Sequence, residues 1–396
     1  MTGKFSNLFK SFFDSEKVAG LLLLFCTIVS IAIANSSFGG GYAAFMHHHA
    51  DASFIHSSLN LSVEDWVNDG LMTIFFLMVG LEVERELYNG ELADMKTAIL
   101  PVVAAFGGMI VPSLIHFLLN KGTATQPGFA IPMATDIAFA LGILSLAGNK
   151  IPASVKVFLA ALAIIDDIGA IIVIALFYTK TVFFYYLAGG IGIWVMLLIF
   201  NKMRIRSLWL YLLPGTVMWY CFLRSGVHPT LSGVMLAFVI PFRNADDEKN
   251  VSLRLQQFLQ VPVAYIIVPV FALVNTAIVL PRHFLQHIVT PNSLGIIVGL
   301  FAGKVIGIVS FPLLLIKLGK AKLQSNITLS FLTGIGFLGG IGFTMSMFIS
   351  NLAFDDSITV AASKLSILIG SSLSAVVGLL VLRFAKKRGE EKVKDK

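Results

Sequence analysis

The chain has 396 residues, of which 57% are hydrophobic and only 13% are charged, and its formal net charge is +7. The mean hydropathy of +0.86 lies far above that of soluble domains, so the composition excludes a soluble enzyme. The basic residues are dispersed over the loops, where anionic lipid headgroups account for the positive charge, and we expect no nucleic-acid partner.

Apolar segments follow one another along the whole chain, and a helix needs about 20 apolar residues to cross a bilayer. We predict a single all-α integral membrane protein with about twelve transmembrane helices. Their predicted positions are 18–36, 63–83, 97–119, 128–147, 153–178, 183–200, 208–223, 228–241, 255–279, 294–316, 325–349 and 359–383. The segments 128–147 and 228–241 are short or polar, so eleven or thirteen crossings stay open.

The distribution of Lys and Arg tests this topology, because cytoplasmic loops hold an excess of basic residues. With the amino terminus in the cytoplasm, 23 of the 29 basic residues lie in cytoplasmic segments, and five, Lys364 among them, lie in outer loops or their margins. The remaining one, Lys304, lies inside a span. An even number of crossings then predicts that both termini are cytoplasmic.

The longest outer loop, residues 37–62, contains four histidines and no Lys or Arg. His47, His48 and His49 are consecutive, which is not a ligand geometry that a helix or hairpin provides, so we interpret the loop as solvated rather than as a zinc site. The loop is long enough for a small hairpin that could pair with a second protomer. This is a weak indication of a homodimer.

Acidic residues are rare in spans, because a carboxylate at the bilayer centre costs roughly 2.5–3.5 kcal/mol. Of the 22 Asp and Glu residues, we place only Glu82, Asp136, Asp166 and Asp167 within or at the edge of spans. Lys304 is the only basic residue that we place deep in one. Four acids and one base in hydrocarbon indicate an ion or proton pathway better than they indicate packing.

Asp166 and Asp167 are adjacent in the middle of an apolar run, with no basic residue beside them. Helix neighbours point about 100° apart, so either one faces an ion while the other turns toward a partner. Lys304 is the candidate partner. Its span has glycines at every fourth position from Gly295 to Gly307, which indicates either a closely approaching backbone or ordinary small-residue helix packing.

Carboxylates removed from water bind protons readily, and their oxygens also suit a hard cation such as Na⁺. Protons and Na⁺ would therefore compete for the same oxygens of Asp166 and Asp167. A site that must be either protonated or cation-bound is the physical minimum for exchange, whereas a channel needs no such competition. The pair accordingly favours a secondary active transporter, not an enzyme, with no cofactor.

Two of the predicted spans look like broken helices. In the fourth, Pro132 removes a backbone donor, and Thr135 and Asp136 place polar groups at mid-membrane depth. The eleventh contains five glycines between residues 334 and 342. Gly or Pro interruptions in corresponding spans of two halves indicate an ion site at the bilayer midplane, with Asp136 compensating positive half-helix ends.

The two interrupted spans predict inverted-topology repeats formed by spans three to five and ten to twelve, because seven positions separate each member from its counterpart. The repeats are inferred from this organisation, since the halves share no convincing residue-by-residue identity. The single domain, 1–396, would consist of core repeats at about 97–178 and 294–383, an interface region at about 18–83 and 183–279, and a cytoplasmic tail at 384–396.

Five motifs closely resemble the NhaA family of bacterial sodium/proton antiporters, and the resemblance extends over nearly the whole chain. They are Ala134–Ala140, Leu162–Ala170, Ser225–His228, Gly303–Lys304 and Gly340–Ser346. The first two together are highly specific. The family is known for inverted repeats and for two broken, crossing helices, so the resemblance supports that architecture but does not predict it independently.

The resemblance implies electrogenic export of cytoplasmic Na⁺ or Li⁺ for outer protons across the bacterial inner membrane, with control of internal pH and sodium. It implies that Asp166 and Asp167 form the cation site, that Lys304 pairs with Asp166, and that Thr135 and Asp136 lie at the helix crossing. The second proton is assigned either to Lys304 or to Asp166.

Glu82 and His228 match family positions linked to the pH response, although a capping or loop ion pair at Glu82 and a structural placement of His228 are the alternative interpretations. After Arg254 the chain departs from the family pattern, because Gln256 and Gln260 stand where an acid and a histidine are common. A titratable pH sensor at those two positions is therefore in doubt.

Two other classes of membrane protein are alternatives to an antiporter. An intramembrane aspartyl protease needs two aspartates from two helices facing one peptide bond, which adjacent residues on one helix cannot provide. A sodium-coupled symporter of organic solutes on a related fold is the stronger alternative. It would need polar groups for an organic headgroup, and the chain offers few beyond the ion site.

Overall fold

The computed structural model describes residues 2–51, 60–90, 92–148, 151–179, 181–242, 250–279, 289–321, 323 and 327–394. Within these ranges the chain is helical apart from one short hairpin, which confirms the all-α prediction. The chain divides into two compact units. The first comprises Met1–Phe25, Asp94–Ala170 and Leu280–Lys396, and the second comprises Cys26–Ala93 and Ile171–Val279. The functional division into repeats and an interface region stays a prediction.

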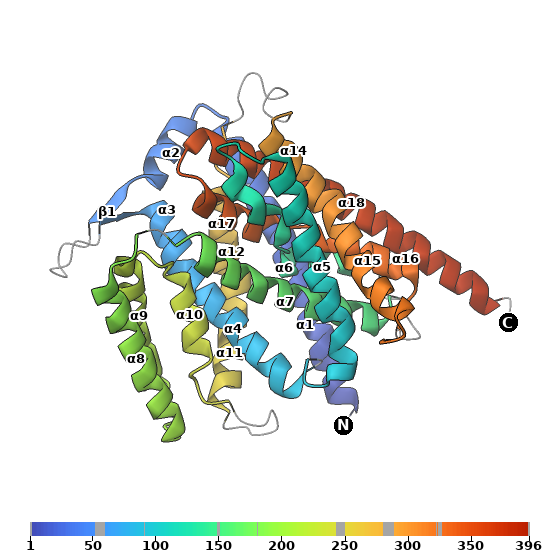
Figure 1. Ribbon diagram of the computed structural model, residues 1–396, viewed down its shortest axis with the longest axis horizontal. Helices are drawn as coiled ribbons and strands as arrows, with labels where there is room; N and C mark the ends of the chain where they lie inside the picture. The colour runs from blue at the N-terminus through green and yellow to red at the C-terminus, as the bar shows by residue number, and fades with distance from the viewer. Residues whose placement is uncertain are drawn as a thin grey trace. The chain divides into compact units, whose positions relative to one another are not determined.

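The first unit contains both interrupted spans. Its helices are the start of α1 (Thr2–Ala34), α5 (Met95–Leu119), the 3-10 helix η3 (Gln126–Met133), α6 (Ile137–Leu146), most of α7 (Ala153–Phe177), α14 (Pro291–Val298), the π turn η5 (Gly299–Gly303), α15 (Lys304–Lys317), α16 (Leu329–Gly339), α17 (Phe343–Ala353) and α18 (Ser357–Lys394). In Figure 1, α5 runs beside α15, and α16 lies against α18.

The glycines of the tenth predicted span lie on the face that packs against α5. A Cβ atom at Gly303 would lie 2.9 Å from the Pro112 Cα atom, and one at Gly307 would overlap the backbone of Gly107. Neither position has room for a side chain. The glycine stripe therefore allows the backbones of α5 and of the α14–α15 span to touch, as the first of the two interpretations predicts.

The second unit consists mainly of paired helices. Its elements are the end of α1, α2 (Gly39–Met46), strands β1 (His49–Asp51) and β2 (Asn60–Ser62), α3 (Val63–Asp65), the π turn η2 (Trp66–Leu71), α4 (Met72–Asn89), the end of α7, α8 (Phe184–Lys202), α9 (Trp209–Ser225), α10 (Thr230–Ala237), α11 (Val251–Pro262), the π turn η4 (Val263–Ile267) and α12 (Val268–Asn275). Within it α10 packs on α4, and α8 packs on α9.

Strands β1 and β2 form an antiparallel ladder in the predicted outer loop, with Ala50 opposite Leu61. Ser62 then begins α3 with a capping box, because its hydroxyl accepts from the Asp65 amide and the Asp65 carboxylate accepts from the Ser62 amide. The ladder provides the strands of a hairpin. Its tip, with His56, lies outside the described residues, and pairing with a second protomer stays a prediction.

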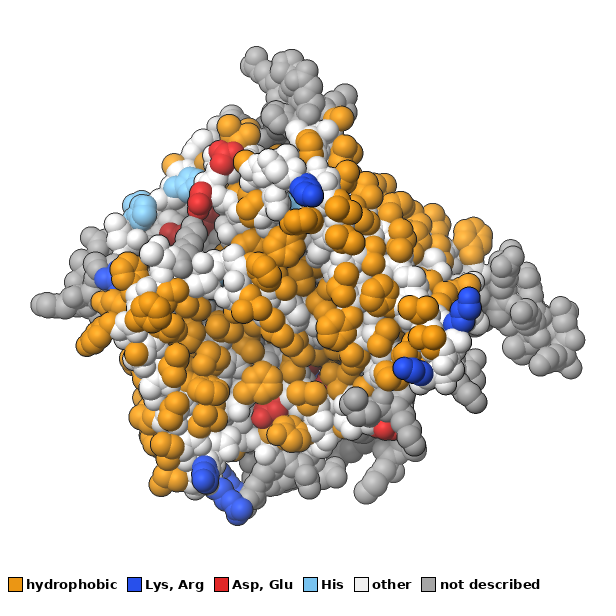
Figure 2. Space-filling model, in the orientation of Figure 1, with side chains coloured by type: hydrophobic (Ala, Val, Ile, Leu, Met, Phe, Trp, Pro, Cys, Tyr) orange, Lys and Arg blue, Asp and Glu red, His pale blue; other side chains and the backbone are white. Residues whose placement is uncertain are grey.

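All twelve predicted spans coincide with a helix or a bent pair of helices. Among the described residues, seven helices are long and apolar enough to cross a membrane, or up to ten if each of three bent pairs is one span. The remaining two are α9 with 17 residues and α10 with eight, which are shorter than a straight crossing needs. Figure 2 shows hydrophobic side chains over most of the visible surface, as lipid contact requires.

The prediction that only four acids lie in spans is wrong, because one membrane-length helix runs from Val63 to Asn89 and contains several more. The first acidic residues of this helix, Glu64 and Asp65, lie in α3. Its last turns extend to Asn89, beyond residue 83, where the span was predicted to end. Glu84 is buried there and accepts a hydrogen bond of 3.0 Å from the Ser252 hydroxyl. Lys364 lies inside α18, which begins at Ser357, and is only 7% exposed. Lys304 is therefore not the only buried lysine.

Asp356, an exposed residue just before α18, gives a test of helix capping. Its carboxylate accepts hydrogen bonds from the Thr359 hydroxyl at 2.7 Å and the Thr359 amide at 2.9 Å, and these hold its pKa below the usual value. The folded state therefore stabilises the charged form, and this contribution is lost as the pH falls through the folded pKa. We expect Asp356→Ala to lower the melting temperature at pH 7, and the difference to shrink at acid pH. Melting curves that stay equally far apart at both pH values would contradict it.

Candidate functional site

The two interrupted spans of the first unit meet at their breaks. Between η3 and α6, residues Ala134 and Asp136 are extended, and the two helices are bent by 41°. Between α16 and α17 the bend is 44°. The Asp136 amide donates to the Ile341 carbonyl at 2.7 Å, so backbone groups freed by one break satisfy groups freed by the other.

Asp136 joins the starts of two half-helices. Its Oδ1 atom accepts from the Phe139 amide at 3.0 Å and so caps α6. Its Oδ2 atom accepts from the Thr344 amide at 3.1 Å and from the Thr344 hydroxyl, in the first turn of α17. A negative charge at both helix N-termini offsets the positive ends of their dipoles.

Asp166 and Lys304 form a buried ion pair beside these breaks. Both side chains are fully buried, and Lys304 Nζ lies 2.5 Å from Asp166 Oδ2. Their elements, α7 and α15, bring together residues 138 positions apart in the chain. Two charges removed from water are tolerated only when they are paired and hydrogen-bonded, and this pair meets that condition.

Thr135 completes the polar contacts of the pair. Its hydroxyl oxygen lies 2.6 Å from Asp166 Oδ2, 2.8 Å from the Gly339 carbonyl and 2.9 Å from Lys304 Nζ. A hydroxyl has one proton, so Thr135 donates to either the carboxylate or the carbonyl at one time and accepts from the ammonium. The hydroxyl thus connects the ion pair to the break between α16 and α17.

The two aspartates interact with Lys304 in different ways. Asp166 Oδ1 is buried and has no hydrogen-bond partner among the residues that the structure describes, so one oxygen of the ion-paired carboxylate still has free lone pairs. Asp167 is 1% exposed, one residue further along α7, and its charge contributes to the field at the Lys304 ammonium. Oxygen atoms of two carboxylates and a hydroxyl are the donor set that a hard cation prefers.

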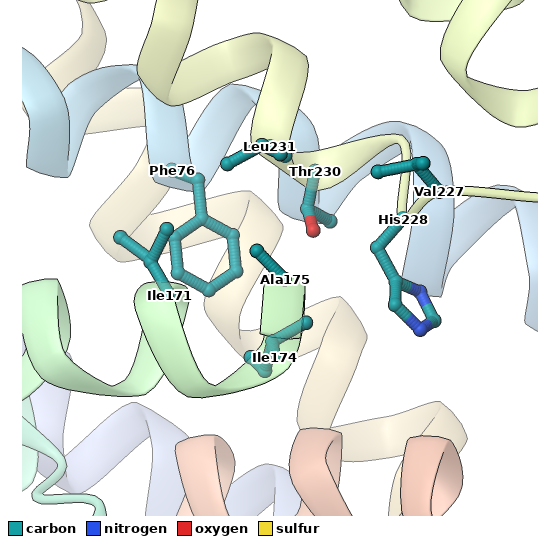
Figure 3. Close-up of a pocket in the computed structure, with 8 residues that line it drawn as sticks. All are labelled: Phe76, Ile171, Ile174, Ala175, Val227, His228, Thr230 and Leu231. Atoms are coloured by element: carbon teal, nitrogen blue, oxygen red, sulfur yellow. The ribbon is translucent and has the colours of Figure 1, made fainter. Parts of the chain in front are cut away.

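Glu82 and His228 belong to the second unit, and each has a local partner. Glu82 lies 3.5 Å from Arg85, one turn along α4, in a partly exposed ion pair that contributes little stability. His228 Nε2 lies 3.1 Å from the Tyr178 carbonyl and therefore donates to it. Figure 3 shows the His228 ring beside Ile174 and Ala175, at a cavity of about 10 Å³ that has room for roughly one water molecule.

Three buried polar groups were not singled out from the sequence. Ser371 in α18 accepts from the amides of Gly342 and Phe343, both at 3.2 Å, and so caps the second break. This contact spans 28 or 29 residues and has no local signal. Thr344 lies inside the Gly340–Ser346 motif, but its contact with Asp136 depends on the fold. Glu84 was missed because the end of its helix was placed too early.

Comparison with known proteins gives consistent matches over nearly the whole chain. Residues 10–382 match the profile of the family described as Na+/H+ antiporter 1. The chain is 51% identical over 391 residues to the Na(+)/H(+) antiporter NhaA of Dechloromonas aromatica, with 98% of each chain covered. It is 50% identical over 381 residues to the Na(+)/H(+) antiporter NhaA 1 of Flavobacterium johnsoniae, covering 96% of this chain and 98% of the relative. For the Na(+)/H(+) antiporter NhaA of Pectobacterium atrosepticum the identity is 45% over 380 residues, covering 95% and 97%.

Proposed function

The chain belongs to the Na+/H+ antiporter 1 family, and we propose that it exports cytoplasmic Na⁺ or Li⁺ in electrogenic exchange for outer protons. In this proposal it works in the bacterial inner membrane with both termini in the cytoplasm, and it controls internal pH and sodium. The observation that supports the proposal most directly is the buried Lys304–Asp166 pair, held by Thr135 where two broken helices meet.

The proposed transported-cation site consists of Asp166, Asp167 and Thr135. The unpartnered Asp166 oxygen, the Asp167 carboxylate and the Thr135 hydroxyl offer oxygens of the kind that Na⁺ and Li⁺ bind. Na⁺, Li⁺ and H⁺ are substrates in this proposal, and the site uses no cofactor.

The proposed coupling follows from the charge that this buried site can hold. Two carboxylates and one ammonium leave a single net negative charge, so a buried cation or a proton is stabilised there, whereas both together are not. Arrival of Na⁺ would therefore release protons, and arrival of protons would release Na⁺. Electrogenic exchange needs a second proton, which resides on Lys304 or on Asp166.

Asp136 has a supporting role in the proposal. Its carboxylate offsets the amino-terminal ends of α6 and α17, which would otherwise add positive potential next to the cation site. The field at Asp166 and Asp167 then depends mainly on Lys304. Glu82 and His228 are proposed to tune the response to pH from the second unit, and the outer hairpin is proposed as the contact of a homodimer.

A sodium-coupled symporter of organic solutes is not favoured. The Thr135 hydroxyl near Asp166 is already hydrogen-bonded to the Gly339 carbonyl and the Lys304 ammonium. An organic headgroup would need further donors and acceptors in a cavity of its own size. Uptake measured with and without an organic solute separates the two functions.

The proposal predicts the behaviour of everted membrane vesicles that contain the unmodified protein. After respiration has acidified the vesicle interior, adding NaCl or LiCl should collapse the pH gradient, because cations enter as protons leave. A pH-sensitive dye follows the gradient, and vesicles without the protein are the control. Absence of a response to either cation between roughly pH 6.5 and 9 would rule out the proposed function.

A further inference from the structure

Lys304 directly follows a π turn in the middle of a membrane span. Residues Gly299–Gly303 form the turn η5 between α14 and α15. The Lys304 amide donates to the Gly299 carbonyl, five residues earlier, and not to the Leu300 carbonyl as in an α-helix. A π turn is equivalent to one extra residue in an α-helix, and such turns are frequent at functional sites.

The π turn touches both broken helices of the first unit. A Cβ atom at Gly299 would lie 2.7 Å from the Pro132 side chain in η3. On the other side, a Cβ atom at Gly342 would lie 2.9 Å from Leu300 Cδ2, and one at Gly340 would overlap the Leu300 carbonyl. The turn that carries Lys304 is therefore in direct contact with the first broken helix and with the break of the second.

The Leu300 carbonyl is the acceptor that the Lys304 amide would use in a regular α-helix. Leu300 is fully buried, and the Ser374 hydroxyl of α18 lies 3.5 Å from its carbonyl oxygen, at the limit of a hydrogen bond. This contact is long and therefore weak, so it hardly opposes a second donor. The Lys304 amide thus has a second candidate acceptor one residue along the helix.

The buried ion pair needs a way to open. Lys304 and Asp166 are both fully buried, so the ammonium is kept from water as long as the pair stays closed. An ion pair in a medium of low dielectric is also strong, and it separates only if both partners find new contacts. A movement of the backbone that carries Lys304 would meet this need.

We propose that the π turn Gly299–Gly303 is a register switch for Lys304. When the Lys304 amide exchanges the Gly299 carbonyl for the Leu300 carbonyl, the extra residue passes to the other side of Lys304. The side chain then rotates by about 100° and leaves Asp166, whose oxygens become available to a cation. Helix register shifts of this kind occur in microseconds to milliseconds, fast enough for transport. The switch rests on the proposed exchange at Asp166.

Deleting one residue of the turn tests the switch. Deletion of Ala302 removes the extra residue and leaves Gly299, Gly303 and Lys304 in the positions that α5 and Asp166 contact. We expect the deletion protein to accumulate and to melt at or above the wild-type temperature, because the ion pair is kept. Its Na⁺-dependent response in everted vesicles should fall by at least roughly tenfold, because Lys304 can no longer leave Asp166.

The matched control is Ala302→Ser, which keeps the length of the turn and should transport within about twofold of wild type. A deletion protein that also transports within that range overturns the switch. A wild-type protein that does not respond to Na⁺ overturns the proposed function as well, so the two failures are distinguishable.

A second pair of variants decides the matter if the deletion protein does not accumulate. Leu300→Ala removes the side chain that packs the turn against the break between α16 and α17. Ile296→Ala instead opens a similar buried space in α14. We expect Leu300→Ala to transport roughly tenfold more slowly than Ile296→Ala at similar melting temperature, and Leu300→Met to recover the rate. Equal rates in Leu300→Ala and Ile296→Ala would overturn the switch.

Discussion

Asp167→Asn should abolish the Na⁺- and Li⁺-dependent response of everted vesicles, with a loss of at least about 100-fold. Asparagine keeps the size of the side chain, so α7 should still pack with residue 167 almost fully buried. It has neither the negative charge that attracts a cation nor an oxygen that takes up and releases a proton. Cation binding and proton exchange should therefore both fail when one carboxylate oxygen is replaced by an amide nitrogen.

Asp356→Asn is the matched control for this change. Asp356 lies at the exposed start of α18, and its hydrogen bonds are to Thr359 rather than to the cation site. The control protein should give a response close to wild type at the same expression level. Full activity in Asp167→Asn would show that the cation is bound and exchanged elsewhere.

Lys304→Met should have the largest effect on stability, because it leaves the Asp166 carboxylate buried without its ion-pair partner. Breaking a buried pair by removing one member typically costs about 3–5 kcal/mol. Methionine fills a similar volume, so loss of packing contributes little. We expect a clear fall in the melting temperature of the purified protein in detergent, together with loss of transport.

The double variant Lys304→Met with Asp166→Leu separates stability from function. Replacing both charges with apolar groups removes the cost of an unpaired buried charge, so the melting temperature should return toward that of wild type. Transport should stay absent, because half of the cation site is gone. If Lys304→Met alone melted like wild type, the ion pair would not be a stabilising element of the fold.

The membrane architecture could be read from the sequence because its signals are local. Apolar segments of membrane length, Pro132 in one span and a glycine cluster in another are properties of short stretches of chain, and the structure has helices and breaks at those places. The end of α4 was misplaced for a related reason. The predicted span ended at residue 83, and the Ser252 hydroxyl that donates to the Glu84 carboxylate lies 168 residues away in the chain, so no local signal shows that contact.

The candidate site was predictable in its members but only partly in its geometry. Charged residues in an apolar run are costly, so Asp166, Asp167 and Lys304 stood out without any structure. From the residues alone, either aspartate could have faced the lysine. The rotation of α7 about its axis decides this, and it brings Asp166 Oδ2 to within 2.5 Å of Lys304 Nζ.

The sequence by itself determined that this chain crosses the membrane many times, that two spans are interrupted, and that Asp166, Asp167 and Lys304 lie within spans, although it missed other buried charges such as Glu84. These follow from hydropathy and from Gly and Pro, whose effects act within a few residues. Only the tertiary structure decided that Asp136 and Thr344 meet, that Thr135 holds the ion pair, and that Lys304 follows a π turn. Such contacts depend on helix rotation and register, which are set by packing between segments far apart in the chain.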